Sequence, residues 1–308
     1  MGEPVCTVTI TPPRYEGRVS VRDGRLLGVA EFGPTSAEQN VVWFHGTPGA
    51  RRQVPEAARR IADERGVRII GIDRPGVGLS TGHLYDRLLD STEDLRLAFD
   101  KLGVDRFSTV GLSGGAPYAL ACAYAFGTRV PSVGILGGVV PSGGEEGTGG
   151  GLVSLAHRFK PLLPLMVEPA GALLATIVRA ARPVGPWAID LYGRFAPEGD
   201  RRVLAEPENK EMFLDDLYNS GRHGMRAAVY DAILFTRDWG FSVRELRVPV
   251  TWWQGDADNI VPLSHAEHIV QLIPGAELRV RPGDGHLGGL GIAEEVLDTI
   301  LDWDTGGR

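Results

Sequence analysis

The sequence is poor in cysteine and has no excess of basic charge. Two cysteines, Cys6 and Cys122, occur among 308 residues, too few for a disulfide framework or a thiol metal site. We therefore expect free thiols in a reducing compartment and a cytoplasmic location. The formal net charge of −7 leaves no basic field for a phosphate backbone, so nucleic acid is not expected as a partner.

Long uninterrupted apolar runs are also lacking. The most apolar region, 151–183, contains Arg158, Lys160, Glu168 and several prolines. These residues interrupt it before the about 20 apolar residues of a membrane-crossing helix accumulate, so we predict no transmembrane segment. The first residues lack the basic start and apolar stretch of a secretory signal. The overall composition, 43% hydrophobic and 23% charged, is that of a globular protein.

Apolar runs that end in Gly, Pro, Asp or His alternate with helical stretches. This pattern predicts a mostly parallel sheet with crossover helices. The expected strands lie at 40–46, 67–76, 107–115, 132–141, 248–256 and 276–286, and the expected helices at 54–65, 90–102, 116–127, 262–273 and 293–303. The opening segments 8–13 and 24–33 predict an antiparallel hairpin at the sheet edge. Chemistry is expected where the runs end, because ligands of such sheets bind beyond the carboxyl ends of the strands.

One long interval breaks this alternation. From 142 to 242 no strand is evident, and a glycine-rich stretch leads into apolar helical segments and then an acidic stretch. We interpret the interval as a helical lid inserted after a core strand. The predicted domains are therefore a core, 1–141 with 243–308, and a cap, 142–242.

A glycine-framed serine stands between an expected strand and an expected helix, in "GLSGG" at 111–115. A serine hydroxyl must be held out to a base before it can act as a nucleophile. Small residues at Gly111 and Gly115 would prevent collisions between strand and helix, while Ser113 takes a strained conformation. The helix start adds N–H groups that favour negative charge. The same residues would also suit a plain turn with a capping serine.

The base has to come from elsewhere in the chain. His286 follows the last expected strand on a glycine-flanked loop, "RPGDGHLGG", and we predict that it takes the proton of Ser113. His265 and His268 lie on an expected helix, where histidines are more often surface residues. Their spacing would suit a metal only with further ligands, and none is evident, so no metal or cofactor is expected.

A carboxylate on the second ring nitrogen would orient the base. We predict Asp258, in "WWQGDADNIVP", because it lies far out on the loop after a strand; Asp256 would cap the turn. Asp284 is the competing orienter, two residues before the histidine. The order Ser113, Asp258, His286 is that expected for a serine hydrolase of the α/β type.

Two backbone N–H groups are expected to hold the oxyanion. One belongs to Gly114, directly after the nucleophile, and the other to Thr47, in the loop "WFHGTPGAR" after an early strand. His45 in the same loop could be mistaken for the base, but a residue at this turn more plausibly supports the loop by hydrogen bonding.

Five motifs occur in one order: "HGTPG" at 45–49, "DRPGVGLS" at 73–80, "GLSGG" at 111–115, "GDADNIVP" at 255–262 and "GDGHLG" at 283–288. With them the sequence resembles the α/β-hydrolase fold superfamily, and is most similar to its esterase and proline iminopeptidase-like branch. The resemblance implies an α/β fold with an eight-stranded, mostly parallel sheet, helices on both faces and a helical lid after the sixth strand. It also implies hydrolysis of an ester, amide or thioester without a cofactor. Epoxide hydrolases and haloalkane dehalogenases are excluded, because they carry an aspartate where Ser113 stands.

Two features separate the sequence from the proline iminopeptidases, whose loop usually reads HGGPG. Thr47 replaces a glycine, and the serine turn is less bulky. An aminopeptidase would also need acidic lid residues to hold the substrate's ammonium group. The candidates are Glu168, Glu206, Glu208, Glu211, Asp215 and Asp216, which we interpret as a solvated helix face.

Apolar lid residues favour a different substrate. Leu162, Leu163, Leu165, Met166 and Val167 suit an apolar acyl or alcohol group. We predict a serine hydrolase that cleaves a small, apolar ester or amide substrate. The alternatives are a proline iminopeptidase-like aminopeptidase, an acyltransferase or perhydrolase, and a non-hydrolytic ligand-binding protein. The oligomeric state is not predicted.

Overall fold

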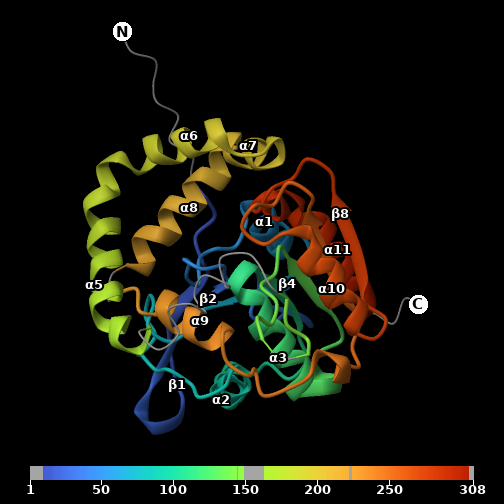
Figure 1. Ribbon diagram of the computed structural model, residues 1–308. Coiled ribbons are helices and arrows are strands. Elements are labelled where there is room, and N and C mark those ends of the chain that lie inside the picture. Colours follow the sequence, from blue (N-terminus) through green and yellow to red (C-terminus); the bar gives the residue numbers. More distant parts are fainter. Residues whose placement is uncertain (1–9, 144, 149–162, 222–223, 305–308) are drawn as a thin grey trace.

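The chain is built around one eight-stranded sheet (Figure 1). The computed structural model describes residues 10–143, 145–148, 163–221 and 224–304. The strand order is β1-β2-β4-β3-β5-β6-β7-β8. The strands are β1 Tyr15–Ser20, β2 Leu26–Phe32, β3 Gln39–Phe44, β4 Val67–Ile72, β5 Ser108–Leu112, β6 Val133–Leu136, β7 Val250–Gly255 and β8 Glu277–Arg281. From β4 to β8 every neighbouring pair is parallel, as the alternation of strands and helices predicts.

Helices cover both faces of the sheet. The helices of the core are α1 Glu56–Arg65, α2 Ser91–Leu102, α3 Ala116–Phe126, α10 Leu263–Leu272 and α11 Ala293–Asp304. Side chains of α2, α3 and α10 belong to one apolar cluster, and those of α1 and α11 to a second cluster on the other face. Central strands are therefore apolar at nearly every position: all six residues of β4 are buried. The predicted α/β fold with its mostly parallel eight-stranded sheet is confirmed.

The prediction of the first strand was wrong. Residues 10–13 form no strand, residues 8 and 9 lie outside the described residues, and the hairpin partner of β2 is β1. The physical reason is Pro12 and Pro13, which have no backbone N–H to donate to a neighbouring strand. The second half of the predicted hairpin, 24–33, contains β2 as expected.

Helices make up most of the described part of the interval between β6 and β7. They are α5 Leu163–Ala181, α6 Gly185–Phe195, α7 Glu198–Ala205, α8 Pro207–Ser220 and α9 Ala227–Phe235. In Figure 1, α5 forms one edge of the molecule, and α6 and α7 lie across the end of it. We propose that this insertion forms a cap with the predicted bounds 142–242. Parts of the glycine-rich stretch, and Leu162, lie outside the described residues.

One helical run within the described residues is long and apolar enough to cross a membrane by length and composition alone. It is Leu163–Phe195, with a mean hydropathy of 1.4 and 22% of its most apolar window buried. The run consists of α5 and α6, which meet at a bend (Figure 1). The run is therefore not one continuous straight helix.

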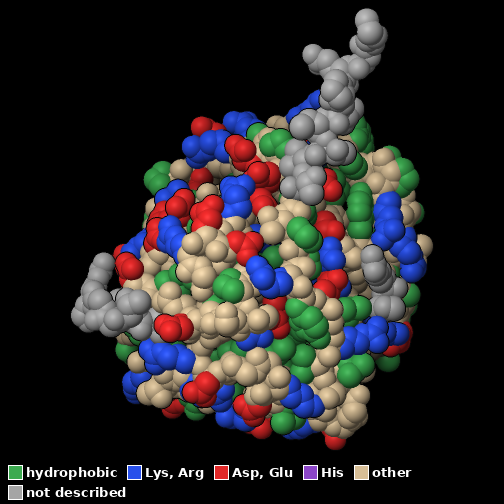
Figure 2. Space-filling model, turned by 180° about the vertical axis from the view of Figure 1, so that it is seen from behind, with side chains coloured by type: hydrophobic (Ala, Val, Ile, Leu, Met, Phe, Trp, Pro, Cys, Tyr) green, Lys and Arg blue, Asp and Glu red, His purple; other side chains and the backbone are tan. Residues whose placement is uncertain are grey.

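Charged side chains of both signs are interspersed over the face seen from behind (Figure 2). This face carries no continuous basic patch, in keeping with the formal net charge of −7. Of the cysteines, Cys122 is a buried free thiol in α3, and burial raises its pKa. Cys6 lies outside the described residues.

Candidate active site

The turn after β5 holds Ser113 in a conformation that few serines adopt. Its φ is 51°, in the left-handed region. A β-carbon at Gly111 would lie 2.6 Å from Cα of Ala116, and one at Gly115 would collide with the carbonyl of Phe44. The two glycines thus let the strand and α3 pack closely, and the turn between them presents the Ser113 side chain, as the motif predicts.

Ser113, His286 and Asp258 form one chain of hydrogen bonds. His286 Nε2 lies 2.8 Å from Ser113 Oγ, and its Nδ1 lies 2.8 Å from Asp258 Oδ2. Because an ionised carboxylate can only accept, Nδ1 carries the ring proton and Nε2 is left to accept from the hydroxyl. The three residues come from loops after β5, β7 and β8, which meet at the carboxyl edge of the sheet.

Asp258 is fixed by more donors than the sequence indicates. Its Oδ1 accepts from the N–H groups of Ile260 and Val261, and its Oδ2 accepts from Gln254 Nε2 as well as from His286. Gln254 is a buried residue of β7. No motif identified it, since its role follows from the path of the loop back over the strand.

The competing residues have other partners. Asp256 accepts from the N–H of Gly283, the turn-capping role expected of it. Asp284 pairs with Arg202 and Arg281. His265 and His268 lie on α10, and no group of three potential metal ligands occurs among the described residues.

The loop after β3 supplies the second predicted N–H group. Most of the other backbone N–H groups in this loop already donate hydrogen bonds. The N–H of Gly46 donates to Gln53, and that of Arg51 donates to Asp73. The N–H groups of Ala50 and Arg52 both donate to Asp216. Among the hydrogen bonds between described residues, none uses the N–H of Thr47. A β-carbon at Gly114 would collide with Thr47 Oγ1, so the two predicted donors lie against each other beside Ser113.

A buried ion pair holds this loop from behind. Arg74 donates to the carbonyls of His45 and Gly46 and to Thr47 Oγ1 (2.7 Å), and pairs with Asp231 at 2.8 Å. Asp231 also accepts from Thr47 Oγ1 (2.6 Å). The sequence contained a signal for Arg74, which lies in "DRPGVGLS", but none for Asp231, which comes from α9.

His45 supports the loop rather than acting at the serine. Its Nδ1 lies 2.7 Å from the carbonyl of Gly46, and its Nε2 accepts from the N–H of Arg74. Burial and the neighbouring Arg74 hold the pKa of His45 well below its usual value. The ring is therefore neutral at pH 7, as its acceptor role requires.

A cavity of about 420 Å³ opens at Ser113 and His286. Its wall is mainly apolar and comes from both the core and the insertion. The apolar lining comprises Pro48, Leu112, Val178, Ala181, Ala188, Ile189, Leu204, Phe213, Leu214, Leu217, Ile260 and Leu287. Of the described residues that line it, none is Lys or Arg. A neutral, apolar group fits this wall better than an anion, because a buried charge needs a partner.

The acidic residues considered for an ammonium site mostly lie elsewhere. Of those candidates, all of them described, Asp216 alone lines the cavity. Its two oxygens already accept from the N–H groups of Ala50 and Arg52, and burial raises its pKa well above its usual value. Glu168, Glu208 and Asp215 pair with arginines. Asp216 thus anchors α8 to the loop after β3.

Helix α7 holds the loop of His286. Asp200 is 1% exposed and accepts from the N–H of Leu287 at 3.0 Å, and Gly199 donates to the carbonyl of Gly283 at 2.9 Å. Burial raises the pKa of Asp200. No sequence motif identified it, because the contact joins an insertion helix to a distant loop.

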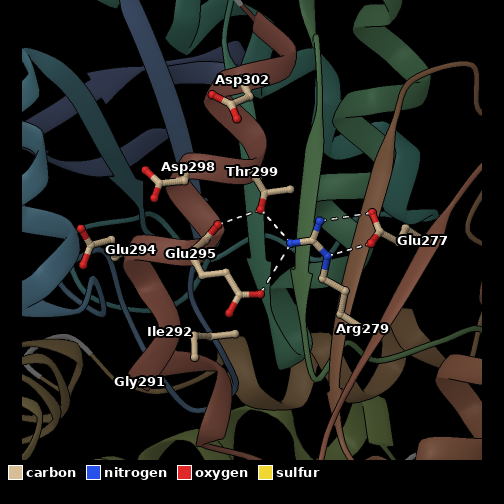
Figure 3. A pocket seen from close by; sticks show the side chains of 9 residues that line it. All are labelled: Glu277, Arg279, Gly291, Ile292, Glu294, Glu295, Asp298, Thr299 and Asp302. Atoms are coloured by element: carbon tan, nitrogen blue, oxygen red, sulfur yellow. Dashed lines mark hydrogen bonds and ion pairs between the residues drawn. The ribbon is translucent and has the colours of Figure 1, made fainter. Parts of the chain in front are cut away.

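A second hollow, of about 490 Å³, lies between β8 and α11 (Figure 3). Arg279 stands in it between Glu277 on one side and Thr299 and Glu295 on the other. None of the five residues predicted to take part in catalysis lines it. Arg279 pairs with its neighbours there, whereas Glu294 and Asp298 pair with Arg65 outside the hollow. No serine, cysteine or histidine is among the described lining residues.

Comparisons with known proteins agree with the fold described above. A family model described as "alpha/beta hydrolase fold" matches residues 39–290. A curated relative, the 2-hydroxy-6-oxononadienedioate/2-hydroxy-6-oxononatrienedioate hydrolase of Paraburkholderia phymatum, is 25% identical over 96% of this chain and 98% of its own.

Solved structures share the fold. The bromoperoxidase from Bacillus anthracis has a TM-score of 0.68 at 20% identity, and the esterase from Exiguobacterium antarcticum 0.66 at 18% identity. In each case the match covers 94% of this chain and 100% of the solved one.

Proposed function

Because this chain belongs to the α/β-hydrolase fold family and is a hydrolase of that fold, we propose that it cleaves a small, neutral, apolar carboxylic ester through an acyl-enzyme. The observation that carries the proposal is the hydrogen-bond chain from Ser113 through His286 to Asp258, at the mouth of an apolar cavity. Ser113 is the nucleophile, His286 the base and Asp258 its orienter.

Acylation follows from the positions of the ring nitrogens. As Ser113 Oγ bonds to the ester carbonyl carbon, its proton passes to His286 Nε2, and the carbonyl oxygen becomes an oxyanion held by the N–H groups of Thr47 and Gly114. The carbon–oxygen bond to the alcohol then breaks, and His286 returns the proton to the departing alcohol. Asp258 stays ionised and stabilises the imidazolium.

Deacylation repeats these roles with water. His286 takes a proton from water, the resulting oxygen bonds to the acyl carbon, and the ester bond to Ser113 Oγ breaks as the hydroxyl regains its proton. No cofactor takes part. An acyltransferase or perhydrolase would use the same serine with another acceptor in place of water.

The cavity wall supports a neutral substrate. The name of the curated relative specifies a dicarboxylate, whereas no Lys or Arg is among the described lining residues here. Burying a neutral polar group without a partner costs about 2–7 kcal/mol, and burying an unpaired charge costs more. A carboxylate bound among these described residues would have no cation to pair with. The esters of apolar acyl groups carry no such charge.

The aminopeptidase alternative has one observation in its favour, the carboxyl of Asp216 in the cavity wall. Both of its oxygens are taken by backbone N–H groups, and its raised pKa disfavours the charged form that an ammonium group needs. We therefore prefer the esterase.

A fluorophosphonate tests the nucleophile directly. The intact mass of the protein after treatment should rise by one adduct, and Ser113→Ala should take none. Ser20→Ala, which changes an exposed serine at the end of β1, is the matched control and should label fully. An adduct on Ser113→Ala, or no adduct on a folded wild type, would contradict the assignment.

Ester and amide preference is then measured with p-nitrophenyl esters of increasing acyl length and with N-terminal proline amides. The apolar wall predicts faster hydrolysis of the butyrate or hexanoate than of the acetate, and no proline amidase activity. Ser113→Ala should lower kcat by about 10⁴-fold or more. Hydrolysis of the proline amide alone would favour the aminopeptidase.

A further inference from the structure

The outer sides of α5 and α6 expose an unusual number of large apolar side chains. We call this set, with Val184 from the turn between the two helices, the cap face: Leu165, Met166, Leu173, Ile177, Val184, Trp187, Leu191 and Phe195. Phe195 is 84% exposed, Leu165 75% and Trp187 63%. Single exposed apolar residues are ordinary, but so many on two successive helices are typical of an interaction site.

The inner sides of the same helices are apolar as well. Val178 and Ala181 of α5, and Gly185, Ala188 and Ile189 of α6, line the cavity at Ser113. A helix with large apolar residues on both its inner and its outer side normally has both sides covered. Helix α6 packs against α7 and α8, yet none of its residues is buried, so its outer side is left for a partner. No residue of the cap face lines the cavity, so this partner is separate from the substrate.

The charges on these helices indicate which partner. Their two acidic residues are neutralised, Glu168 by Arg226 and Asp190 by Lys210. Arg179, Arg182 and Arg194 are exposed, and none of them has a carboxylate partner within the described part of the chain. These three arginines, which we call the rim of the cap face, lie on α5, α6 and the turn between them, on a chain whose formal net charge is −7.

A second copy of the chain fits this rim poorly. In a twofold dimer the same face meets itself, so the arginines of one copy would approach those of the other across an apolar contact. Like charges at such a contact repel one another. A surface that combines an apolar layer with anionic groups matches both features.

We propose that the cap face docks on the surface of an anionic phospholipid bilayer. The arginines meet the lipid phosphates, and the Trp187, Leu191 and Phe195 side chains enter the boundary between headgroups and acyl chains. The helices lie in the surface instead of crossing it, because α5 and α6 meet at a bend (Figure 1) and each carries a charged pair.

Co-sedimentation of the full chain with vesicles tests the docking. We expect binding to vesicles of phosphatidylcholine mixed with phosphatidylglycerol, and much weaker binding to phosphatidylcholine alone. Tryptophan fluorescence should shift to the blue on binding, since Trp187 is exposed whereas Trp43, Trp239, Trp252 and Trp253 are at most 3% exposed. Trp187→Phe should bind and lose the shift.

Two sets of variants separate the apolar and electrostatic parts. Replacing Ile177, Leu191 and Phe195 together by serine should lower the partition coefficient at least about tenfold on both kinds of vesicle. Replacing the three arginines by glutamine should lower it by about 100-fold on the anionic vesicles only. Val280→Ser, at an exposed apolar position of β8, is the matched control and should bind as the wild type does.

Three results would overturn the proposal: no vesicle binding, binding that survives both sets of substitutions, or a dimer in light scattering that the serine variant abolishes without any vesicle binding. The last result would assign the cap face to a second copy. Fluorophosphonate labelling runs in parallel. A chain that is labelled and does not bind vesicles refutes only the docking, and a chain that binds vesicles and is not labelled refutes only the proposed function.

Discussion

At Ser113 the backbone conformation favours glycine, whereas the proposed chemistry requires a hydroxyl. A φ of 51° costs a serine about 1–3 kcal/mol, whereas glycine adopts it freely. The position nevertheless carries a side chain that lies 2.8 Å from His286 Nε2. The protein is therefore less stable with serine at this position than it would be with glycine. Such a loss of stability is typical of residues kept for function.

This strain predicts a difference in stability between two variants that the proposed function expects to be inactive. Ser113→Gly relieves the backbone and Ser113→Ala retains it, so the glycine variant should be more stable by about 1 kcal/mol after the larger entropy of glycine in the unfolded chain is counted. Urea denaturation of both proteins measures the difference. Equal stabilities would mean that the turn is not strained in solution.

The carboxylate of Asp258 sets the tautomer of His286, and Asp258→Asn tests this. The new amide oxygen can still accept from Ile260 and Val261, which leaves the amide nitrogen facing His286. The ring then turns its unprotonated Nδ1 to the amide and protonates Nε2, which can no longer take the proton of Ser113. We expect kcat for ester hydrolysis to fall about 10⁴-fold with the fold intact.

Asp256→Asn is the matched control for that substitution. Asp256 lies two residues away and accepts only from the N–H of Gly283 among the described residues, so its replacement should leave kcat within about threefold. A loss of less than about tenfold in Asp258→Asn would contradict the role of Asp258.

Among the elements, α9 and α7 connect the insertion to the site. Helix α9 brings Asp231 to Arg74 and Thr47, behind the predicted oxyanion donors. Helix α7 brings Asp200 to the loop of His286. The insertion therefore lines the cavity and also holds two loops on which the proposed chemistry depends, those of Thr47 and His286.

Removing the charge of Asp231 should weaken both the fold and the site. In Asp231→Asn the guanidinium of Arg74, 3% exposed, loses its anionic partner, which costs about 3 kcal/mol or more for a buried pair. The loop with Thr47 loses its anchor, so kcat should fall more than KM rises. Urea denaturation and ester kinetics measure the two effects.

The same substitution at Asp190 in α6 provides the control. Its pair with Lys210 is exposed, and exposed pairs contribute about 0–1 kcal/mol. If Asp231→Asn were as mild as Asp190→Asn, the contact between α9 and the oxyanion loop would be unimportant.

At the scale of the whole molecule, buried titratable groups make stability depend on pH. His45 is neutral in the fold because burial and Arg74 lower its pKa, whereas in the unfolded chain it titrates near about 6.5. Below that pH the unfolded state binds a proton that the folded state does not. The free energy of unfolding therefore falls as the pH falls below about 6.5, by up to about 1.4 kcal/mol per pH unit.

His45→Gln removes this contribution. At about pH 8 the variant should be the less stable protein, because it loses hydrogen bonds of the loop. Between about pH 6.5 and 5 its stability should decline less than that of the wild type, by about 1–2 kcal/mol. Urea denaturation at both pH values measures this. Parallel curves for the two proteins would show that the fold does not lower the pKa of His45. Burial also raises the pKa values of Asp73 and Asp216. Their contribution to the pH dependence of the free energy of unfolding is the same in both proteins and cancels in the comparison.

The sequence by itself determined the alternation of strands and helices, because apolar runs, glycines and prolines act locally along the chain. It placed β4, β5 and β7 within a few residues of their bounds. It also singled out Ser113, Asp258 and His286, which lie near strand ends, where a turn exposes them whatever the rest of the chain does. The prediction of β1 was wrong, because it relied on the alternation of apolar residues in 8–13 and neglected Pro12 and Pro13 at the end of that segment.

Only the tertiary structure decided how distant segments meet. Asp231 lies 157 residues from Arg74, and Asp200 lies 87 residues from Leu287, so no local pattern relates them. Which apolar residues of α5 and α6 line the cavity and which form the cap face depends equally on how the helices turn against the core. Hydrophobic periodicity shows that a helix has apolar residues, but long-range packing selects the side that is buried, since burial is a property of contacts between elements.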